Sequence, residues 1–419
     1  MKEVRRVLVG FEFGEKESQI CYYDRKLREP VSVPARVGTN QLAFPTSLTG
    51  IPDSGEWHCG TEAEYFAAHE GGTAVRTAED SFYETVRKGK DFQIGEKRFG
   101  ADELLEFFLR ESLKMLGLAD PVKSIAGIGV TVRALTGDFA VRIQQALGRI
   151  GFRRDICFVM DEDESFYYYG YSQRPEISSR NMALICFDGD CAVCKSMSEN
   201  RTKKPFIVTV TEKGSTVLPD NFEERDASFA EAAEEWMKSG GFSGVFITGS
   251  GFSPEWASKS VKVLSGHGAR VFEGSNLHVK GACWAVFERL ERHAFKNRMF
   301  IGPDHVRAAV GIDIIEGNGQ KFYPLIRPGL NWYEAFADCE LIPDGRNDLF
   351  VTIIPSGGQA HRSERIVLTG LPARPDRATR LRVRASCTSP DTCRLDAEDL
   401  GFGELFPATH QHWTMDVSL

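Results

Sequence analysis

The first hydrophobic pattern in the chain is a pair of apolar runs joined by a glycine-bearing turn. Residues 7–24 predict a strand that runs into Gly10-x-x-x-Gly14 and then a second, returning strand. Residues 125–132 are almost continuously apolar, which is typical of a strand buried in a parallel or mixed sheet. Apolar residues at helical spacing predict two amphipathic helices, at residues 101–116 and 139–150. A further short strand is predicted at residues 156–160.

The same pattern restarts in the next segment. Residues 182–187 form an apolar strand, Asp188-Gly189 predicts a two-residue hairpin turn, and residues 192–197 return. Helices are then predicted at 229–237, 254–264 and 278–292, around a buried strand at 244–248. Two halves that each open with strand, turn and strand predict a duplicated α/β architecture with a ligand cleft between them.

From about residue 300 the helical periodicity disappears. Short strands are predicted at residues 320–326, 348–354 and 379–385, separated by turn sequences. This spacing predicts a β-sandwich. In the third of these strands, Arg380, Arg382 and Arg384 alternate with apolar residues, so we expect them on its solvent-exposed face.

Composition narrows the class of protein. A net charge of −8 and a pI near 5.7 argue against a nucleic-acid partner, and no apolar run reaches the length that spans a membrane. Ten scattered cysteines favour reduced thiols and a cytoplasmic location. Cys191 and Cys194 have no second ligand pair, so a metal site is not expected there. Cys387 and Cys393 flank a Ser-Pro-Asp turn and could face each other across a hairpin, although chance spacing is the preferred interpretation.

Several segments resemble one known family. They are the turn at Gly10-x-x-x-Gly14, the motif 188–190 (DGD), the loop 248–254 (TGSGFSP) and the segments 323–329 (YPLIRPG) and 368–372 (LTGLP). In this order they resemble two phosphate loops, an adenosine loop and a substrate-binding sandwich of the DnaK-type (seventy-kilodalton heat-shock) chaperones, which belong to the actin-like ATPase superfamily.

The resemblance implies an α/β actin-like ATPase fold, duplicated and two-lobed, followed by a C-terminal β-sandwich. The segment between Gly189 and Gly249 is too short for the helical subdomain that the family has there, so one subdomain is expected to be missing. The implied domains are a first lobe at 1–170, a shortened second lobe at 171–298, and a sandwich without a lid at 299–419.

The resemblance also implies a site. Its cofactor, if any, would be ATP or ADP with magnesium, held by Gly10, Gly14, Lys16, Gly189, Gly249, Ser250 and Gly251. The candidate catalytic acids are Glu12, Asp188, Glu162 and Glu164. Glu12 and Asp188 have two open interpretations, as ligands of magnesium-bound water or as vestigial loop acids. Glu12 replaces an aspartate of the family, and Thr85 stands at the position of its catalytic lysine unless a register shift brings Arg87 or Lys88 there.

Two functions follow from these departures. The first is a protein-binding or scaffold module with weakened or lost ATP binding and turnover, whose sandwich binds a protein or peptide. The alternative is an ATP-binding, chaperone-like ATPase whose nucleotide state controls peptide binding. A filament former is less favoured, and the oligomeric state stays open. The aromatic run at residues 166–171 predicts a helix packed on a sheet, or else a partner-binding patch.

Overall fold

The structure is a computed structural model that describes residues 6–36, 38–52, 54–238, 240–266, 268–316, 319–343, 347–356 and 360–419. The chain divides into two compact units, Met1–Met299 and Phe300–Leu419, and each is described by itself. Among the helices of these residues, none is long and apolar enough to cross a membrane.

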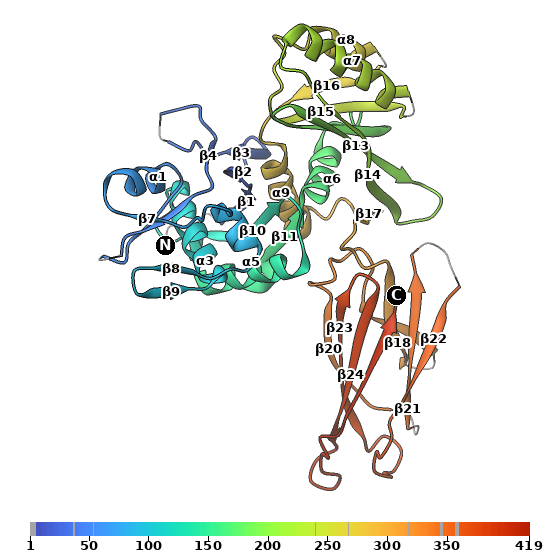
Figure 1. Cartoon of the computed structure of the whole chain (residues 1–419). Helices are drawn as coiled ribbons and strands as arrows, with labels where there is room; N and C mark the ends of the chain where they lie inside the picture. The colour runs from blue at the N-terminus through green and yellow to red at the C-terminus, as the bar shows by residue number, and fades with distance from the viewer. Residues whose placement is uncertain are drawn as a thin grey trace. The chain divides into compact units, whose positions relative to one another are not determined.

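The first unit contains two sheets with the same topology (Figure 1). In each, three consecutive strands form an antiparallel meander, and two later strands add in parallel beside the first of the three. The first sheet has the order β11-β10-β1-β2-β3, with β4 also paired to β2. Its strands are β1 (Val7–Phe13), β2 (Glu17–Asp24), β3 (Glu29–Ser32), β4 (Ala43–Pro45), β10 (Ile125–Val132) and β11 (Cys157–Asp161).

The second sheet has the order β16-β15-β12-β13-β14-β17. Its strands are β12 (Asn181–Asp188), β13 (Cys191–Asn200), β14 (Phe206–Val217), β15 (Phe242–Ser250), β16 (Arg270–Glu273) and β17 (Arg298–Phe300). Asp188 pairs with Cys191, so the hairpin turn is Gly189-Asp190. The predicted turn at Asp188-Gly189 is therefore wrong by one residue, because Asp188 still belongs to the strand.

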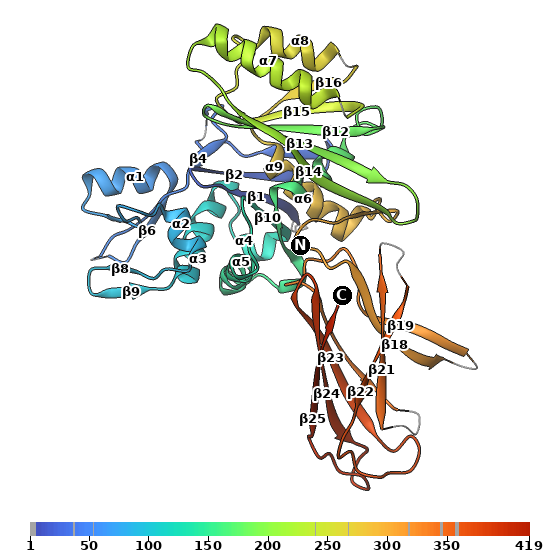
Figure 2. The ribbon, with the colours of Figure 1, turned by 45° about the vertical axis from the view of Figure 1, so that its right-hand side comes forward.

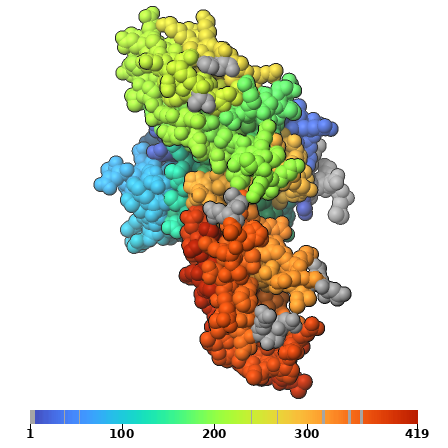
Figure 3. Space-filling view, turned by 90° about the vertical axis from the view of Figure 1, so that its right-hand side faces the viewer, coloured from blue at the N-terminus to red at the C-terminus, as the bar shows by residue number. Residues whose placement is uncertain are grey.

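Helices cover both faces of each sheet (Figures 1 and 2). Alternate residues of β1 point in opposite directions: Phe11 and Phe13 contact Phe108 of α3, and Gly10 faces α9. On the second sheet Phe187 contacts Phe229 of α7, and α6 packs on the other face. The helices that pack on these two sheets are α3 (Ala101–Leu113), α5 (Gly137–Ile150), α6 (Glu162–Ser172), α7 (Phe222–Lys238), α8 (Ser258–Gly266) and α9 (Leu277–Phe287). In the space-filling view, α7 and the β13–β14 hairpin form much of the visible surface of this unit (Figure 3).

Smaller elements complete the first unit. A three-stranded sheet has the order β6-β5-β7, and β8 and β9 form a hairpin. The short strands are β5 (Leu48–Gly50), β6 (Trp57–Cys59), β7 (Thr73–Ala74), β8 (Phe92–Ile94) and β9 (Lys97–Phe99). The short helices are α1 (Gly60–His69), α2 (Phe82–Arg87) and α4 (Pro121–Ser124), with 3-10 turns at Lys114–Leu116 and Arg154–Ile156 and a π turn at Glu288–Arg292.

The helix starts that differ most from their predictions are those of α7 and α8. Helix α7 begins at Phe222, seven residues before the predicted start, because the Asn221 side chain caps it by accepting the Glu223 N–H at 3.0 Å. Helix α8 begins at Ser258 and not at 254. Its first N–H groups, of Lys259 and Ser260, donate to the carboxylate of Asp226 on α7 at 2.8 and 2.9 Å.

A close approach between β1 and α9 depends on Gly10. A Cβ added at Gly10 would lie 2.3 Å from the Val279 carbonyl oxygen and 2.7 Å from the Cys283 nitrogen. Both atoms are helix backbone and cannot move aside alone, so Gly10→Ala is expected to lower the free energy of unfolding by about 1–3 kcal/mol in urea. The control is Gly148→Ala on α5, where an added Cβ meets no atom within 4 Å. It should stabilise slightly, by about 0.5–1 kcal/mol. Equal stability of the two variants would contradict the close approach.

The second unit consists of two four-stranded antiparallel sheets with one shared hydrophobic core. Their orders are β19-β18-β21-β22 and β20-β23-β24-β25. The core joins inward-facing residues of both sheets, such as Val351 on β21 and Val383 on β23. The strands are β18 (Ala308–Glu316), β19 (Gly319–Ile326), β20 (Phe336–Leu341), β21 (Asp348–Pro355), β22 (Arg362–Val367), β23 (Arg380–Ser389), β24 (Thr392–Gly401) and β25 (His412–Ser418).

The outer face of β23 carries the arginines expected there, and each meets an acid on β20. Arg382 lies 2.6 Å and Arg384 3.5 Å from Asp338, and Arg380 lies 3.3 Å from Glu340. The alternation with buried residues confirms the predicted exposed face.

A buried ion pair organises one end of this unit. Asp399, on the inner face of β24, is fully buried, and the Arg374 guanidinium donates to its two oxygens at 2.7 and 2.8 Å. Asp399 also accepts from the backbone N–H groups of Gly401 and Thr409, both at 3.0 Å. These donors hold the pKa of Asp399 well below its usual value. One carboxylate therefore ties the segment before β23 to both ends of the loop between β24 and β25.

Candidate functional site

The candidate acids gather where the parallel strands of the first unit end. Glu12 is one residue from the end of β1 and pairs with Thr131 on β10. Glu162 opens α6 directly after β11, and Asp188 is the last residue of β12 in the other sheet. The duplicated topology therefore brings the ends of both sheets to one region, as carboxyl ends of parallel strands do in α/β proteins.

Glu12 points toward α9, and its carboxyl group has an unusually high pKa. Burial, with the negative charge of Glu162, raises the pKa of Glu12 to about 8, although the Val279 N–H lowers it. In the part of the chain that the structure describes, Glu12 Oε2 is buried without a hydrogen-bond partner. Without a bound cation the Glu12 carboxyl is therefore mostly protonated at pH 7, and a magnesium ion would have to displace this proton in order to bind.

Asp188 has the opposite environment. Arg133, just after β10, donates to it at 3.1 Å, and Lys16, in the β1–β2 turn, lies 3.6 Å away. These two cations lower the pKa of Asp188. The ion pairs join the turn of the first sheet directly to the hairpin of the second, so the positive charge nearest to the two loops is already engaged.

The two remaining acids have different surroundings. Glu164 is buried in α6 and accepts a 2.5 Å hydrogen bond from Arg289, in the turn after α9. Glu162 is half-buried and its charge acts on Glu12 and on Arg133. The structure therefore brings Glu162 into the cluster with Glu12 and Asp188 and assigns Glu164 to a separate structural ion pair.

The glycines expected to bind a cofactor contact the chain's own backbone. A Cβ at Gly249 would lie 2.0 Å from the Phe187 carbonyl oxygen, and one at Gly251 would lie 2.1 Å from the Gly189 carbonyl oxygen. The Gly189 N–H donates to the Ser250 carbonyl at 2.9 Å. A Cβ at Gly14 would lie 2.2 Å from the Glu17 carbonyl oxygen. Packing within the fold is sufficient to require Gly14, Gly249 and Gly251.

A cavity of about 260 Å³ opens at the carboxyl ends of β15 and β16. Gly249, a predicted cofactor residue, contributes to its lining. The other lining residues are Ile247, Thr248, Phe252, Glu273, Gly274 and Ser275. The last three were not predicted, although an acid, a glycine and a serine directly after a short strand are a usable signal for a ligand loop.

A family comparison adds to this geometry. The model described as "Family of unknown function (DUF5716) C-terminal" matches residues 29–303, which is more than half of the chain. The chain belongs to the DUF5716 family. The DUF5716 match begins at β3 and therefore leaves out Glu12 and Lys16, but it includes Asp188 and the cavity. A second model, described as "Domain of unknown function (DUF8552)", matches residues 305–419. No curated protein matches the chain.

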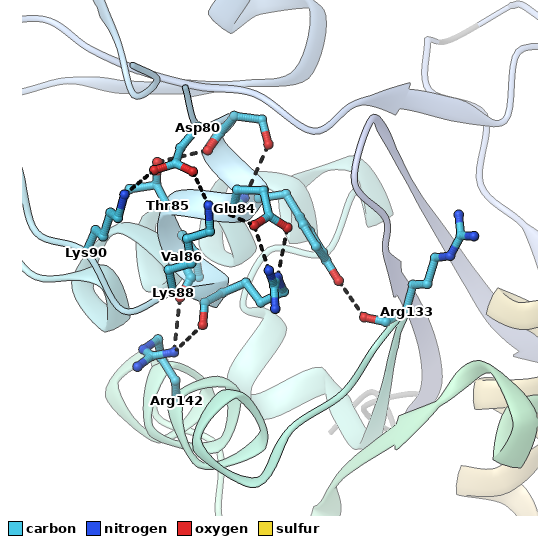
Figure 4. A network of polar contacts seen from close by, with 11 residues as sticks. Asp80, Glu84, Thr85, Val86, Lys88, Lys90, Arg133 and Arg142 are labelled. Carbon is cyan, nitrogen blue, oxygen red and sulfur yellow. Dashed lines mark hydrogen bonds and ion pairs between the residues drawn. The ribbon is translucent and has the colours of Figure 1, made fainter. Parts of the chain in front are cut away.

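Within the DUF5716 match, helix α2 lies at the position of the implied catalytic lysine (Figure 4). Thr85 is buried and donates to the Ser81 carbonyl at 2.8 Å. Arg87 forms two 2.8 Å hydrogen bonds with Glu84, and both Lys88 and Lys90 pair with Asp80. The cations that could replace the lysine are therefore held by acids of the same segment.

The sequence did not predict one buried polar contact inside the DUF5716 region. His278 of α9 lies 2.9 Å from the Ser165 hydroxyl of α6, and both side chains are buried. Burial lowers the pKa of His278. Lys195 of β13 lies 2.6 Å from Asp163 of α6. These contacts join residues far apart in sequence, so no local sequence pattern predicts them.

The described residues contain no cluster of three or more side chains suited to a metal ion. Cys191 and Cys194 lie three positions apart on one strand, so their side chains point to opposite faces of the sheet. The aromatic run on α6 packs mostly inside the unit: Phe166 contacts Phe246, and Tyr167 and Tyr171 contact Phe295.

Proposed function

We propose that this chain is a DnaK-like protein that acts as a protein-binding or scaffold module and has weakened or lost ATP binding and turnover. The resemblance of its loops to those of actin-like ATPases motivates the comparison. The repeated sheet topology of the first unit supports it, because that superfamily is built from two such lobes. The second unit, with two sheets around one core, would correspond to the substrate-binding sandwich.

The observation that carries the loss of ATP binding is the state of Asp188. Lys16 and Arg133 both engage it, and they link the two loops that would otherwise hold the phosphates. A triphosphate would have to compete with the Asp188 carboxylate for these two exposed cations. It would gain no other cation from α2, where Arg87 and Lys88 are paired with acids. Because phosphoryl transfer depends on positive charge positioned at the phosphates, this arrangement favours weak or absent turnover.

Glu12 adds to the misfit. Its carboxyl group holds a proton up to about pH 8 when no cation is bound, so magnesium binding would have to displace that proton. The residues present therefore fit a magnesium-bound triphosphate poorly, and we assign no catalytic step to them.

Protein binding is supported by the surface of the second unit. Nine exposed large apolar side chains occur among its described residues, against six among those of the much longer first unit. Three of the nine lie on the outer face of the β18–β21–β22 sheet and form what we call the outer patch: Ile315, Phe350 and Val367. Phe350 and Val367 are diagonal neighbours on paired strands. Exposed apolar patches of this kind mark interaction sites.

Isothermal titration of the full chain with ATP and ADP, with and without magnesium, tests the first part. No heat is expected at millimolar nucleotide. Micromolar binding that depends on magnesium would contradict the proposal and favour the alternative, a functional ATPase that controls peptide binding. The 260 Å³ cavity beside Gly249 is the observation that favours this alternative, because it lies in the loop that resembles the adenosine loop.

A peptide array probed with the full chain tests the second part. We expect binding to a subset of unmodified peptides, lost in the double variant Phe350→Asp, Val367→Asp. The matched control is Leu27→Asp, an exposed apolar residue of the first unit, which should bind normally. Absence of any bound peptide, or equal binding by all three proteins, would refute the assignment of this surface.

A further inference from the structure

The hairpin of β23 and β24 places two cysteines directly opposite each other. Cys387 pairs in register with Cys393, and the turn between the strands is Pro390-Asp391. Both side chains point to the inner face, where they belong to the shared core. Both are free thiols in this structure.

We propose that Cys387 and Cys393 are a modification site at which a hydroperoxide produces a reversible intramolecular disulfide. Directly opposed residues of antiparallel strands have Cα atoms about 4.5–5.5 Å apart, inside the range that a disulfide bridges. No rearrangement of the hairpin is therefore required. This inference does not depend on the proposed protein-binding function.

The two thiols differ in acidity and in solvent exposure, and this reaction needs one acidic, accessible thiol and one partner. They hydrogen-bond to each other, which lowers the pKa of Cys387 and raises that of Cys393. Cys387 is 8% exposed to solvent, whereas Cys393 is fully buried. Cys387 is thus the thiol that a small oxidant reaches first, and Cys393 is the resolving thiol.

The chain contains a comparison pair. Cys21 and Cys283 also lie close together, but both are fully buried on elements that do not pair as strands. Their thiols donate to the backbone carbonyls of Val279 and Leu8, at 3.1 and 3.7 Å. We expect this pair to stay reduced under conditions that oxidise the hairpin.

The reaction balances with hydrogen peroxide. The Cys387 thiolate attacks one peroxide oxygen, an S–O bond forms, the O–O bond breaks, and one water leaves after protonation. The Cys393 sulfur then attacks the sulfenic sulfur, the S–S bond forms, the S–O bond breaks, and a second water leaves. Both sulfurs are oxidised, and the peroxide is reduced. A dithiol reverses the product by thiol–disulfide exchange.

Mass spectrometry of the full chain tests the proposal. The native protein is treated with peroxide, denatured, alkylated with iodoacetamide and digested with trypsin. Arg384 and Arg394 bound a single peptide, residues 385–394, that contains both cysteines. This peptide is expected to be two hydrogens lighter and unalkylated, and to become doubly alkylated after prior reduction with dithiothreitol. Cys21 and Cys283 should remain alkylated throughout.

Two variants separate the roles of the thiols. Cys393→Ser should accumulate a sulfenic acid at Cys387 that dimedone traps, whereas Cys387→Ser should leave Cys393 unmodified. Two outcomes would overturn the proposal: a peptide 385–394 that stays doubly alkylated after peroxide, or one in which Cys387 becomes sulfinic acid beside an alkylated Cys393. Circular dichroism of each variant establishes that it is folded.

Discussion

Asp399→Ala is expected to lower the free energy of unfolding of the second unit by about 3–5 kcal/mol, because it leaves the Arg374 guanidinium buried without its counter-ion. The Arg374 side chain is only 4% exposed, so water cannot replace the lost carboxylate. The N–H groups of Gly401 and Thr409 lose their acceptor at the same time. Urea unfolding followed by circular dichroism, with the transition of each unit fitted separately, measures the change.

The control for this prediction is Asp338→Ala, which removes the acid from an exposed pair with Arg382. Solvent screens such pairs, so its effect should be much smaller. The pH dependence has a defined sign. The folded-state pKa of Asp399 is depressed, so its contribution is complete above the ordinary value of 3.8 and is lost as the pH falls below it. Equal losses of unfolding free energy in the two variants would show that the buried pair stabilises the unit no more than the exposed pair does.

Glu12→Gln is expected to stabilise the first unit at pH 8 and to have little effect near pH 4. The pKa of Glu12 is about 8 when folded and 4.5 ordinarily, so between these values the folded state keeps a proton that the unfolded chain releases. Stability of the native protein therefore falls as the pH rises through this window and is constant above it. The difference between the two proteins should reach on the order of 4 kcal/mol at pH 8.

Stability measured in urea from pH 4 to pH 9 provides the test. The matched control is Glu15→Gln, the same substitution at an exposed position of the turn that follows β1. Its stability should parallel that of the native protein at every pH. If Glu12→Gln also runs parallel to the native protein, Glu12 is ionised in the folded state and its assignment as a neutral acid is wrong.

Local patterns predicted the central strands and the longer helices of the first unit but left out many short strands, such as β5 to β9, and most strands of the second unit. The continuous apolar run of β10 and the helical spacing of α3 and α5 are properties of short segments, and the structure has these elements where the sequence placed them. The start of α8 could not be predicted in the same way. Its cap, Asp226, belongs to another helix, more than thirty residues earlier, and only tertiary packing brings it there.

For the candidate site, too, the positions of residues could be predicted from local sequence, but their chemical environments could not. Glu12 and Asp188 were chosen from sequence because the loops around them resemble phosphate loops, and the structure places both near the ends of apolar strands. Their chemistry could not be predicted, because it depends on distant partners. Arg133 is 55 residues from Asp188, and the contact between His278 and Ser165 spans 113 residues. By contrast, the facing of Cys387 and Cys393 was visible as a possibility, since a single turn separates them.

The packing of α9 on β1 has a consequence for the order of synthesis. The helix lies late in the first unit, yet it covers the face of the first sheet that contains Gly10, and the Cys21 thiol donates to its Val279 carbonyl. While the ribosome is still making residues 25–276, that face of the emerging sheet has no cover. We therefore expect the first half of the unit to complete its fold only after residue 287 has left the exit tunnel. A protein truncated before α9 should be a client of cellular holdases, not a stable half.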